Sequence, residues 1–242
     1  MTYPVLYGNP VQLNKKDFSS IGITTWGKGL SFTAGAHQVP ALCSEFAVGC
    51  LHYPIVFSRD ASGLVVPLFL LGYREGENLY LDKHGKWLVT YIPSYVRQYP
   101  FILSDDNKNG GEAQVWIDRD GFVQDESGER LFDEAGENSP YLNKVFDLLR
   151  YSMASKRLTQ VFCARLLELD LFVDQVANIA LDDGSQYAVQ GMMMVDEIKL
   201  NQLDDDTILE LFRSGFLGWI NCHMISRANL QGLLTLKSKS TP

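Results

Sequence analysis

The change of sequence pattern at residue 139 constrains the fold more than any other feature of this chain. Ser139 is a favourable N-cap residue, and Pro140 suits the first position of a helix. After them, apolar residues recur every three or four positions up to Leu166, which predicts an amphipathic helix. Lys156 and Arg157 interrupt the pattern with charge, so one long helix and two consecutive helices both fit.

The residues before this point predict strands and turns rather than helices. Residues 53–57 and 65–71 are apolar and flanked by turn formers, as buried strands are. Pro54 and Pro67 are expected at a strand start or a sheet edge, because proline cannot donate a hydrogen bond to a neighbouring strand. These two segments predict the centre of a sheet.

Residues 78–91 predict a hairpin, with strands on both sides of a turn at 82–85. Pro93 then favours a short helical turn over residues 94–99. A polar surface loop is expected at 104–112.

Two more strands, 113–117 and 121–123, are expected to pair around a turn at 119–121. The acidic stretch 125–137 predicts short strands and turns at the surface.

The rest of the second half predicts a hairpin, two helices and a terminal strand. These elements have the following approximate bounds: strands 176–181 and 187–192 around a turn at 182–185, a helix from the Asp204 cap to Gly215, a helix over 217–227, and a strand over 230–236. The order, β-rich 1–137 and α-rich 138–242, predicts an α+β fold. We expect one domain over 1–242, with an antiparallel sheet from the first half covered by helices from the second.

Composition restricts the classes of partner. The chain has 21 Lys and Arg against 29 Asp and Glu, a net charge of −8 at pH 7. This balance disfavours nucleic acid and anionic lipid surfaces as partners. No apolar run approaches the length of a membrane-spanning helix, and the first residues lack the pattern of a secretory signal. Cys43, Cys50, Cys163 and Cys222 form no CxxC motif, which favours reduced, mostly buried thiols and a cytoplasmic location.

Motifs for catalysis, metals and cofactors are missing from the sequence. It contains no Gly-rich phosphate loop, no GxSxG and no closely spaced histidine pair. Residues 105–110 begin like a calcium loop, but Trp116 stands where the bidentate carboxylate belongs. His223 on the last predicted helix favours a half-buried packing role. We therefore expect no catalytic residues, no metal and no cofactor.

One region, residues 73–101, is dense in aromatic side chains beside guanidinium and amide groups. Such a mixture is typical of recognition surfaces, because rigid apolar rings lie next to planar hydrogen-bond donors. In this hypothesis Arg74 or Arg97 pairs with a carboxylate and the aromatic rings pack its apolar part. The alternative is that these residues are the core and rim of a hairpin and helix. The candidate binding residues are Arg74, Glu77, Asn78, Trp87, Tyr91, Tyr95, Arg97 and Tyr99.

Several segments in and after this region resemble the SapC family. They are 53–57, 72–79, 85–87, 91–101, 131–137, 195–201 and 209–215, in the order that the family shows. The resemblance implies an accessory or binding role. The family is associated by name with surface-layer protein export, and its members are often encoded near tryptophan halogenases, TonB-dependent receptors and hydroxylases. It brings no catalytic residues, and Ser94 stands where a small apolar residue is expected.

The function we expect is that of a non-enzymatic, cytoplasmic accessory protein. It would recognise a partner protein or a small carboxylate-bearing ligand that resembles an amino acid or peptide, and it could form a homodimer. A metal-assisted enzyme with a site gathered from His52, Asp196 and His223 is one alternative. A protein–protein scaffold is another.

Overall fold

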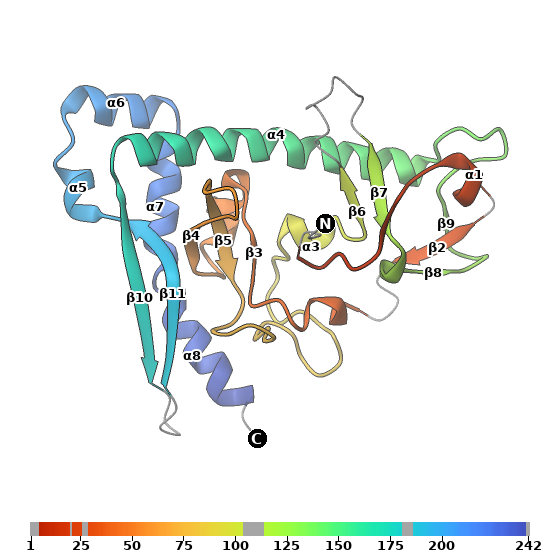
Figure 1. Ribbon diagram of the computed structural model, residues 1–242, viewed down its shortest axis with the longest axis horizontal. Helices are drawn as coiled ribbons and strands as arrows, with labels where there is room; N and C mark the ends of the chain where they lie inside the picture. The colour runs from red at the N-terminus through yellow and green to blue at the C-terminus, as the bar shows by residue number, and fades with distance from the viewer. Residues whose placement is uncertain (1–4, 20, 26–28, 104–113, 181–185, 241–242) are drawn as a thin grey trace.

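The computed structural model describes residues 5–19, 21–25, 29–103, 114–180 and 186–240. The molecule is elongated, and one long helix runs along most of its length (Figure 1). The loop predicted at 104–112 and the turn predicted at 182–185 lie outside the described residues. Antiparallel sheets from the first half and helices from the second confirm the α+β class.

The largest sheet has five antiparallel strands in the order β10-β11-β4-β5-β3. Their bounds are β3 Gln38–Pro40, β4 Ile55–Arg59, β5 Val65–Leu70, β10 Phe172–Ala180 and β11 Gln186–Val195. Met193 of β11 pairs with Phe57 of β4, so both halves of the chain contribute to one sheet. The expectation that the sheet comes from the first half alone is wrong at this edge.

Pro67 lies inside β5, between two neighbouring strands, and not at an edge or a strand start as predicted. The fold accommodates it because β3 has already ended at Pro40. The next residue, Ala41, donates its N–H to the Pro67 carbonyl over 3.0 Å. No ladder hydrogen bond therefore depends on the N–H that proline lacks.

Two small sheets of three strands lie at the other end of the molecule. They are β1-β7-β6, formed by Pro10–Gln12, Val115–Asp118 and Phe101–Leu103, and β8-β2-β9, formed by Phe122–Gln124, Gly22–Thr25 and Glu129–Arg130. The predicted pairing of the strands around 119–121 is wrong, since β7 and β8 belong to different sheets. The buried Asp118 carboxylate accepts hydrogen bonds from the Gly8, Asn9 and Asp120 N–H groups, which bends the chain between them.

In the described residues, the first half of the chain forms three short α-helices, and the longer helices that cover the sheets come from the second half. Their bounds are α1 Lys15–Phe18, α2 Phe46–Gly49, α3 Ser94–Arg97, α4 Pro140–Glu168, α5 Glu197–Asn201, α6 Asp205–Arg213, α7 Phe216–Ser226 and α8 Asn229–Ser240. The Ser139 side chain accepts a hydrogen bond from the Leu142 N–H, which confirms the predicted cap. Lys156 and Arg157 are exposed within a single 29-residue helix.

Two segments differ in secondary structure from the prediction. Residues 78–91 contain a single bridge, Leu81 to Trp87, in place of two paired strands. The adjacent residues Leu79 and Tyr80 are both buried, which the alternating faces of a strand do not allow on a one-sided sheet. The predicted strand at 230–236 is part of helix α8, in which Leu233 is completely buried.

Helix α4 contacts two separate hydrophobic clusters. Leu142 and Leu149 pack in the cluster beneath the two small sheets. Phe162 and Leu166 pack in the larger cluster around the five-stranded sheet. The helix therefore connects both ends of the molecule, and the single domain stays a prediction. Within the described part of the chain, no helix combines the length and apolar character needed to cross a membrane.

Candidate functional site

The sequence-predicted aromatic residues take part in a network of hydrogen bonds inside the fold. The Trp87 Nε1–H donates to the Tyr53 hydroxyl over 2.7 Å, and that hydroxyl donates to the Tyr91 carbonyl. The Tyr80 hydroxyl donates to the His52 carbonyl over 2.8 Å. Trp87 is buried, so its ring contributes to the core, as the alternative interpretation held.

A buried carboxylate, Glu45, lies next to this network. Its side chain accepts hydrogen bonds from the Tyr91 hydroxyl, from the Leu42 N–H, and from both the N–H and the hydroxyl of Ser94. Four donors compensate the loss of water around a residue that is 4% exposed. Burial, and then the charge of Glu45, raises the pKa of Tyr91. The Ser94 hydroxyl therefore donates a hydrogen bond to Glu45, which a small apolar side chain at this position could not do.

The three predicted polar residues at the start of the region also have partners. Glu77 pairs with Lys237 of helix α8 and lies 3.6 Å from the Arg74 Nε. The Asn78 amide donates to the Thr33 carbonyl over 3.1 Å. These contacts hold the loop after β5 against α8 and against the 3-10 helix Ser31–Thr33.

The remaining predicted residues lie in helix α3 or directly after it. The Tyr95 hydroxyl donates to the Val5 carbonyl, and the ring of the buried Tyr99 stacks on Phe32 with centroids 4.1 Å apart. The guanidinium of the exposed Arg97 lies 5.7 Å from the centre of the Tyr91 ring and donates to the Ile92 carbonyl over 3.0 Å. Every predicted residue has a packing or hydrogen-bonding role, and their role in binding stays a prediction.

The structure does not gather the residues of the metal-assisted alternative into one site. His223 is completely buried, and not half-buried as expected. Its Nδ1 bonds the Ile55 carbonyl and its Nε2 accepts the Val195 N–H, so neither nitrogen can bind a metal. Asp196 caps helix α5 and His52 contacts Thr90. Among the described residues, no group of three or more His, Cys, Asp or Glu side chains is arranged to hold a metal ion.

The cysteines are placed as the sequence predicts. Cys43, Cys50 and Cys163 are buried and Cys222 is partly exposed, all as free thiols. Burial raises the pKa of Cys163 to about 12, and burial together with neighbouring Cys50 raises that of Cys222 to about 11. Because the thiolate is the nucleophilic form, these environments are unsuited to cysteine catalysis.

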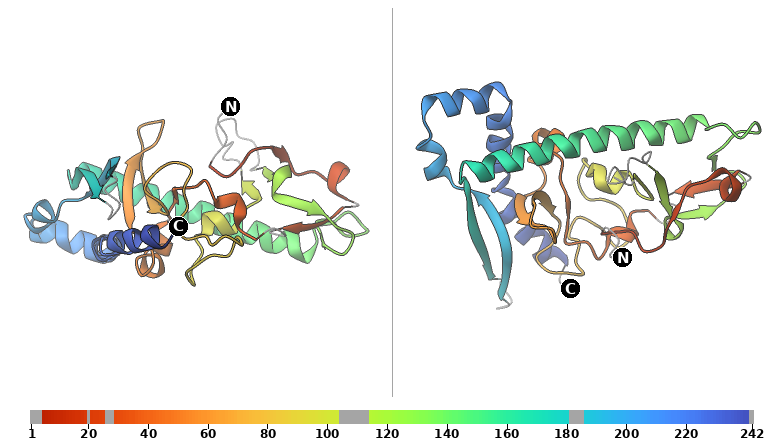
Figure 2. Two further views of the ribbon diagram at one scale, coloured as in Figure 1. Left: turned by 90° about the horizontal axis from the view of Figure 1, so that it is seen from below. Right: turned by 45° about the horizontal axis from the view of Figure 1, so that its top comes forward.

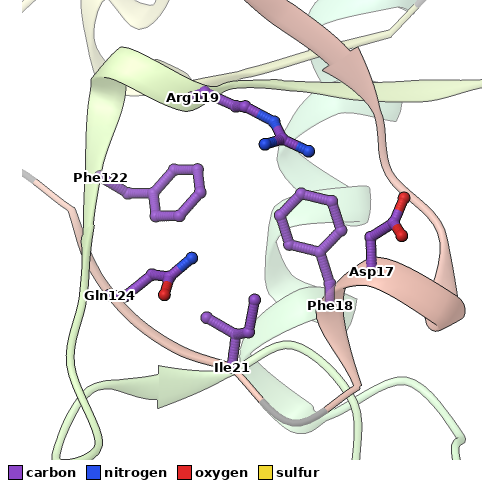
Figure 3. A pocket seen from close by; sticks show the side chains of 6 residues that line it. All are labelled: Asp17, Phe18, Ile21, Arg119, Phe122 and Gln124. Carbon is purple, nitrogen blue, oxygen red and sulfur yellow. The ribbon is translucent and has the colours of Figure 1, made fainter.

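A cavity of about 340 Å³ lies where helix α1, the chain before β2, and strand β8 meet. Its walls combine the apolar side chains of Phe18, Ile21 and Phe122 with polar ones, and the guanidinium of Arg119 and the amide of Gln124 point into it (Figure 3). The lining residues are Asp17, Phe18, Ile21, Arg119, Phe122 and Gln124.

Local structure positions the cavity residues. Arg119 starts the 3-10 helix Arg119–Gly121, which the buried Asp118 side chain caps. Asn14 caps helix α1 by accepting the Asp17 N–H over 2.9 Å, which presents Phe18 to the cavity. Strand β2 pairs Ile23 with Gln124, which brings the two segments together. Within the part of the chain that the structure describes, the Arg119 guanidinium makes no hydrogen bond or ion pair.

Sequence reasoning missed this cavity. Arg119 was expected only as a turn residue, and no periodic pattern marks residues 17–21. The cavity depends on the pairing of β2 with β8, which are about a hundred positions apart in the sequence. The available signal was an arginine three residues before the aromatic Phe122.

The comparison with protein families assigns the chain. The model of the SapC family matches residues 13–233, which include the cavity and the whole aromatic region. The chain belongs to the SapC family. No curated protein and no solved structure matches this SapC sequence. The family assignment predicted from the sequence segments is thus confirmed.

Proposed function

We propose that this SapC protein is a binding module for a small monocarboxylate with an apolar body, held in the Arg119 cavity. The observation that carries the proposal is a guanidinium, without a partner in the described chain, above a hollow lined by Phe18, Ile21 and Phe122. Arginine binds carboxylates through two parallel hydrogen bonds, which supply both affinity and orientation. The ring walls would bury the apolar part of the same ligand.

The polar residues of the rim narrow the ligand class. Asp17 disfavours a second negative charge near the cavity and offers an acceptor to an ammonium group. Gln124 can both donate and accept hydrogen bonds. An amino-acid-like molecule with an aromatic or branched side chain fits this set, and the volume suits a ligand of that size.

The chemistry of the lining supports binding rather than catalysis. It contains one carboxylate and no serine, cysteine, histidine or lysine that could act as a nucleophile with a base. In this proposal the protein is an accessory factor in the cytoplasm that captures or presents its ligand. We also propose, from the family resemblance, that this role is linked to surface-layer protein export or to tryptophan halogenases.

Isothermal titration calorimetry with three probes tests this function. Phenylacetate and L-phenylalanine carry a carboxylate and a ring, whereas benzyl alcohol has the ring alone. We expect the two carboxylates to bind and the alcohol to bind at least tenfold more weakly, because a charge-assisted hydrogen bond is lost. Arg119→Ala should weaken carboxylate binding by a similar factor. Its melting temperature should stay close to that of the wild type, since Arg119 is exposed.

Arg97→Ala is the matched control, because it removes an exposed guanidinium from the sequence-predicted region. The cavity proposal requires that this variant bind the carboxylates as the wild type does. Loss of binding in Arg97→Ala with full binding in Arg119→Ala would move the ligand to the aromatic region. Failure of both carboxylates to bind would remove the proposed function.

A further inference from the structure

Helix α4 has an exposed apolar stripe that no other described element covers. The stripe consists of Tyr151, Ala154, Leu158 and Val161, at successive spacings of three, four and three residues. This spacing places all four on one side of the helix, the arrangement by which helices associate. Val161 is 58% exposed, so the stripe faces outward.

The border of the stripe is positively charged. Arg150 and Arg157 lie along its outer side, and residues 148–167 contain no Asp or Glu, in a chain with 29 of them. Arg157 contacts the Met153 sulfur, and Arg150 makes an exposed pair with Asp147. The stripe therefore suits a partner surface that is both apolar and acidic.

Helix α6 of the same chain has this character. Asp205, Leu209 and Phe212 are exposed and lie at helical spacings of four and three residues, so they share one face. Phe212 is 69% exposed. A helix that presents a carboxylate beside two large apolar side chains is complementary to the α4 stripe.

The position of α6 relative to the stripe makes a symmetric arrangement possible. Arg165 continues the stripe four residues beyond Val161, and it binds Glu210 of α6 through Nε and Nη2 at 2.9 and 2.6 Å. Helix α6 therefore stands at the C-terminal end of the stripe, as the ribbon views show (Figure 2). Glu210 lies about 100° or more around α6 from Asp205, Leu209 and Phe212, so these exposed side chains remain available to a second molecule.

We propose that the α4 stripe is the interface of a two-fold symmetric homodimer. Two α4 helices would cross antiparallel near Leu158, which puts Arg165 of one copy beside Tyr151 of the other, since each lies seven residues, or about 10 Å, from the crossing. Helix α6 of each copy then lies over the N-terminal half of the other stripe. Asp205 of one copy faces Arg150 and Arg157 of the other, and the contact occurs twice, as two-fold symmetry demands.

Sedimentation velocity over a range of concentrations tests the dimer. At micromolar concentrations we expect the sedimentation coefficient of the wild type to correspond to twice the 27.2 kDa mass of one chain. Leu158→Lys places two positive charges against each other on the symmetry axis and should weaken association at least tenfold. The matched control is Leu167→Lys, the same change on an exposed leucine of α4 outside the stripe, which should remain dimeric.

Charge reversal identifies a second copy as the occupant. Arg157→Glu and Asp205→Arg should each weaken the dimer, and the double variant should recover most of the affinity, because the new charges are again opposite. A monomeric wild type overturns the proposal, even if the stripe then captures an acidic amphipathic peptide. A dimer that persists in Leu158→Lys, or that the double variant fails to restore, overturns it as well.

Discussion

At the scale of single residues, His223 connects helix α7 to two strands by donating to Ile55 and accepting from Val195. Burial lowers its pKa from 6.5 to about 4. In the unfolded chain the ring binds a proton below pH 6.5, whereas the folded protein excludes that proton down to about pH 4. Stability from this residue is therefore complete above pH 6.5 and is lost as the pH falls toward 4, by about 3 kcal/mol in total.

Urea unfolding at a series of pH values measures this loss. Carboxylates add their own acid dependence, so the comparison is with His223→Gln, whose amide can donate to one strand and accept from the other without titrating. The free energy of unfolding should fall more steeply for the wild type than for the variant between pH 6.5 and 4. Parallel slopes would mean that His223 binds its proton as readily in the folded protein as in the unfolded chain.

Burial also makes the Glu45 carboxylate depend on its hydrogen-bond donors, one of which is the Ser94 hydroxyl. Ser94→Ala removes one of the four donors to Glu45, and we expect unfolding to become easier by about 1.5–3 kcal/mol. Ser62→Ala is the matched control, because its hydroxyl bonds Asp60 at the surface, where water replaces it at a cost of about 0.5 kcal/mol or less. Chemical denaturation of both variants gives the two values. Equal losses would contradict the buried role of Ser94.

At the scale of elements, local signals identified the structures that depend on local contacts. The Ser139 cap and the Pro140 start predicted helix α4, and Gly215 marks the left-handed turn after α6 with a φ of 80°. Strands β4 and β5 were predicted from their apolar runs between turn formers, and the structure pairs them as neighbours in the sheet. In each of these cases the deciding interaction lies within a few residues of the signal.

Elements that depend on distant contacts were predicted less well. Residues 78–91 have the composition of a hairpin, but hydrogen bonds to Tyr53, His52 and Thr33 hold them instead. The same limit applies to the candidate site. The aromatic residues were recognised by type, yet their partners come from elsewhere in the chain, and the Arg119 cavity exists only because β8 pairs with β2.

At the scale of the whole molecule, helix α4 links two hydrophobic clusters that otherwise belong to different sheets. Lys156 lies between the two contact regions and is exposed, so a proline there breaks the helix without removing a core side chain. We expect Lys156→Pro to separate the stabilities of the two ends. The smaller cluster should lose more, because fewer buried residues support it.

Native-state hydrogen exchange, followed by mass spectrometry, reports on both ends at once. In the wild type, amides of β7 and of β5 should exchange with similar free energies of opening, because α4 makes the two clusters unfold together. In Lys156→Pro the value for β7 should fall well below that for β5. Lys156→Gly weakens the helix by about 1 kcal/mol without breaking it, and should lower both values together. Equal values in the proline variant would mean that contacts other than α4 join the two ends, since the helix would then be dispensable for their coupling.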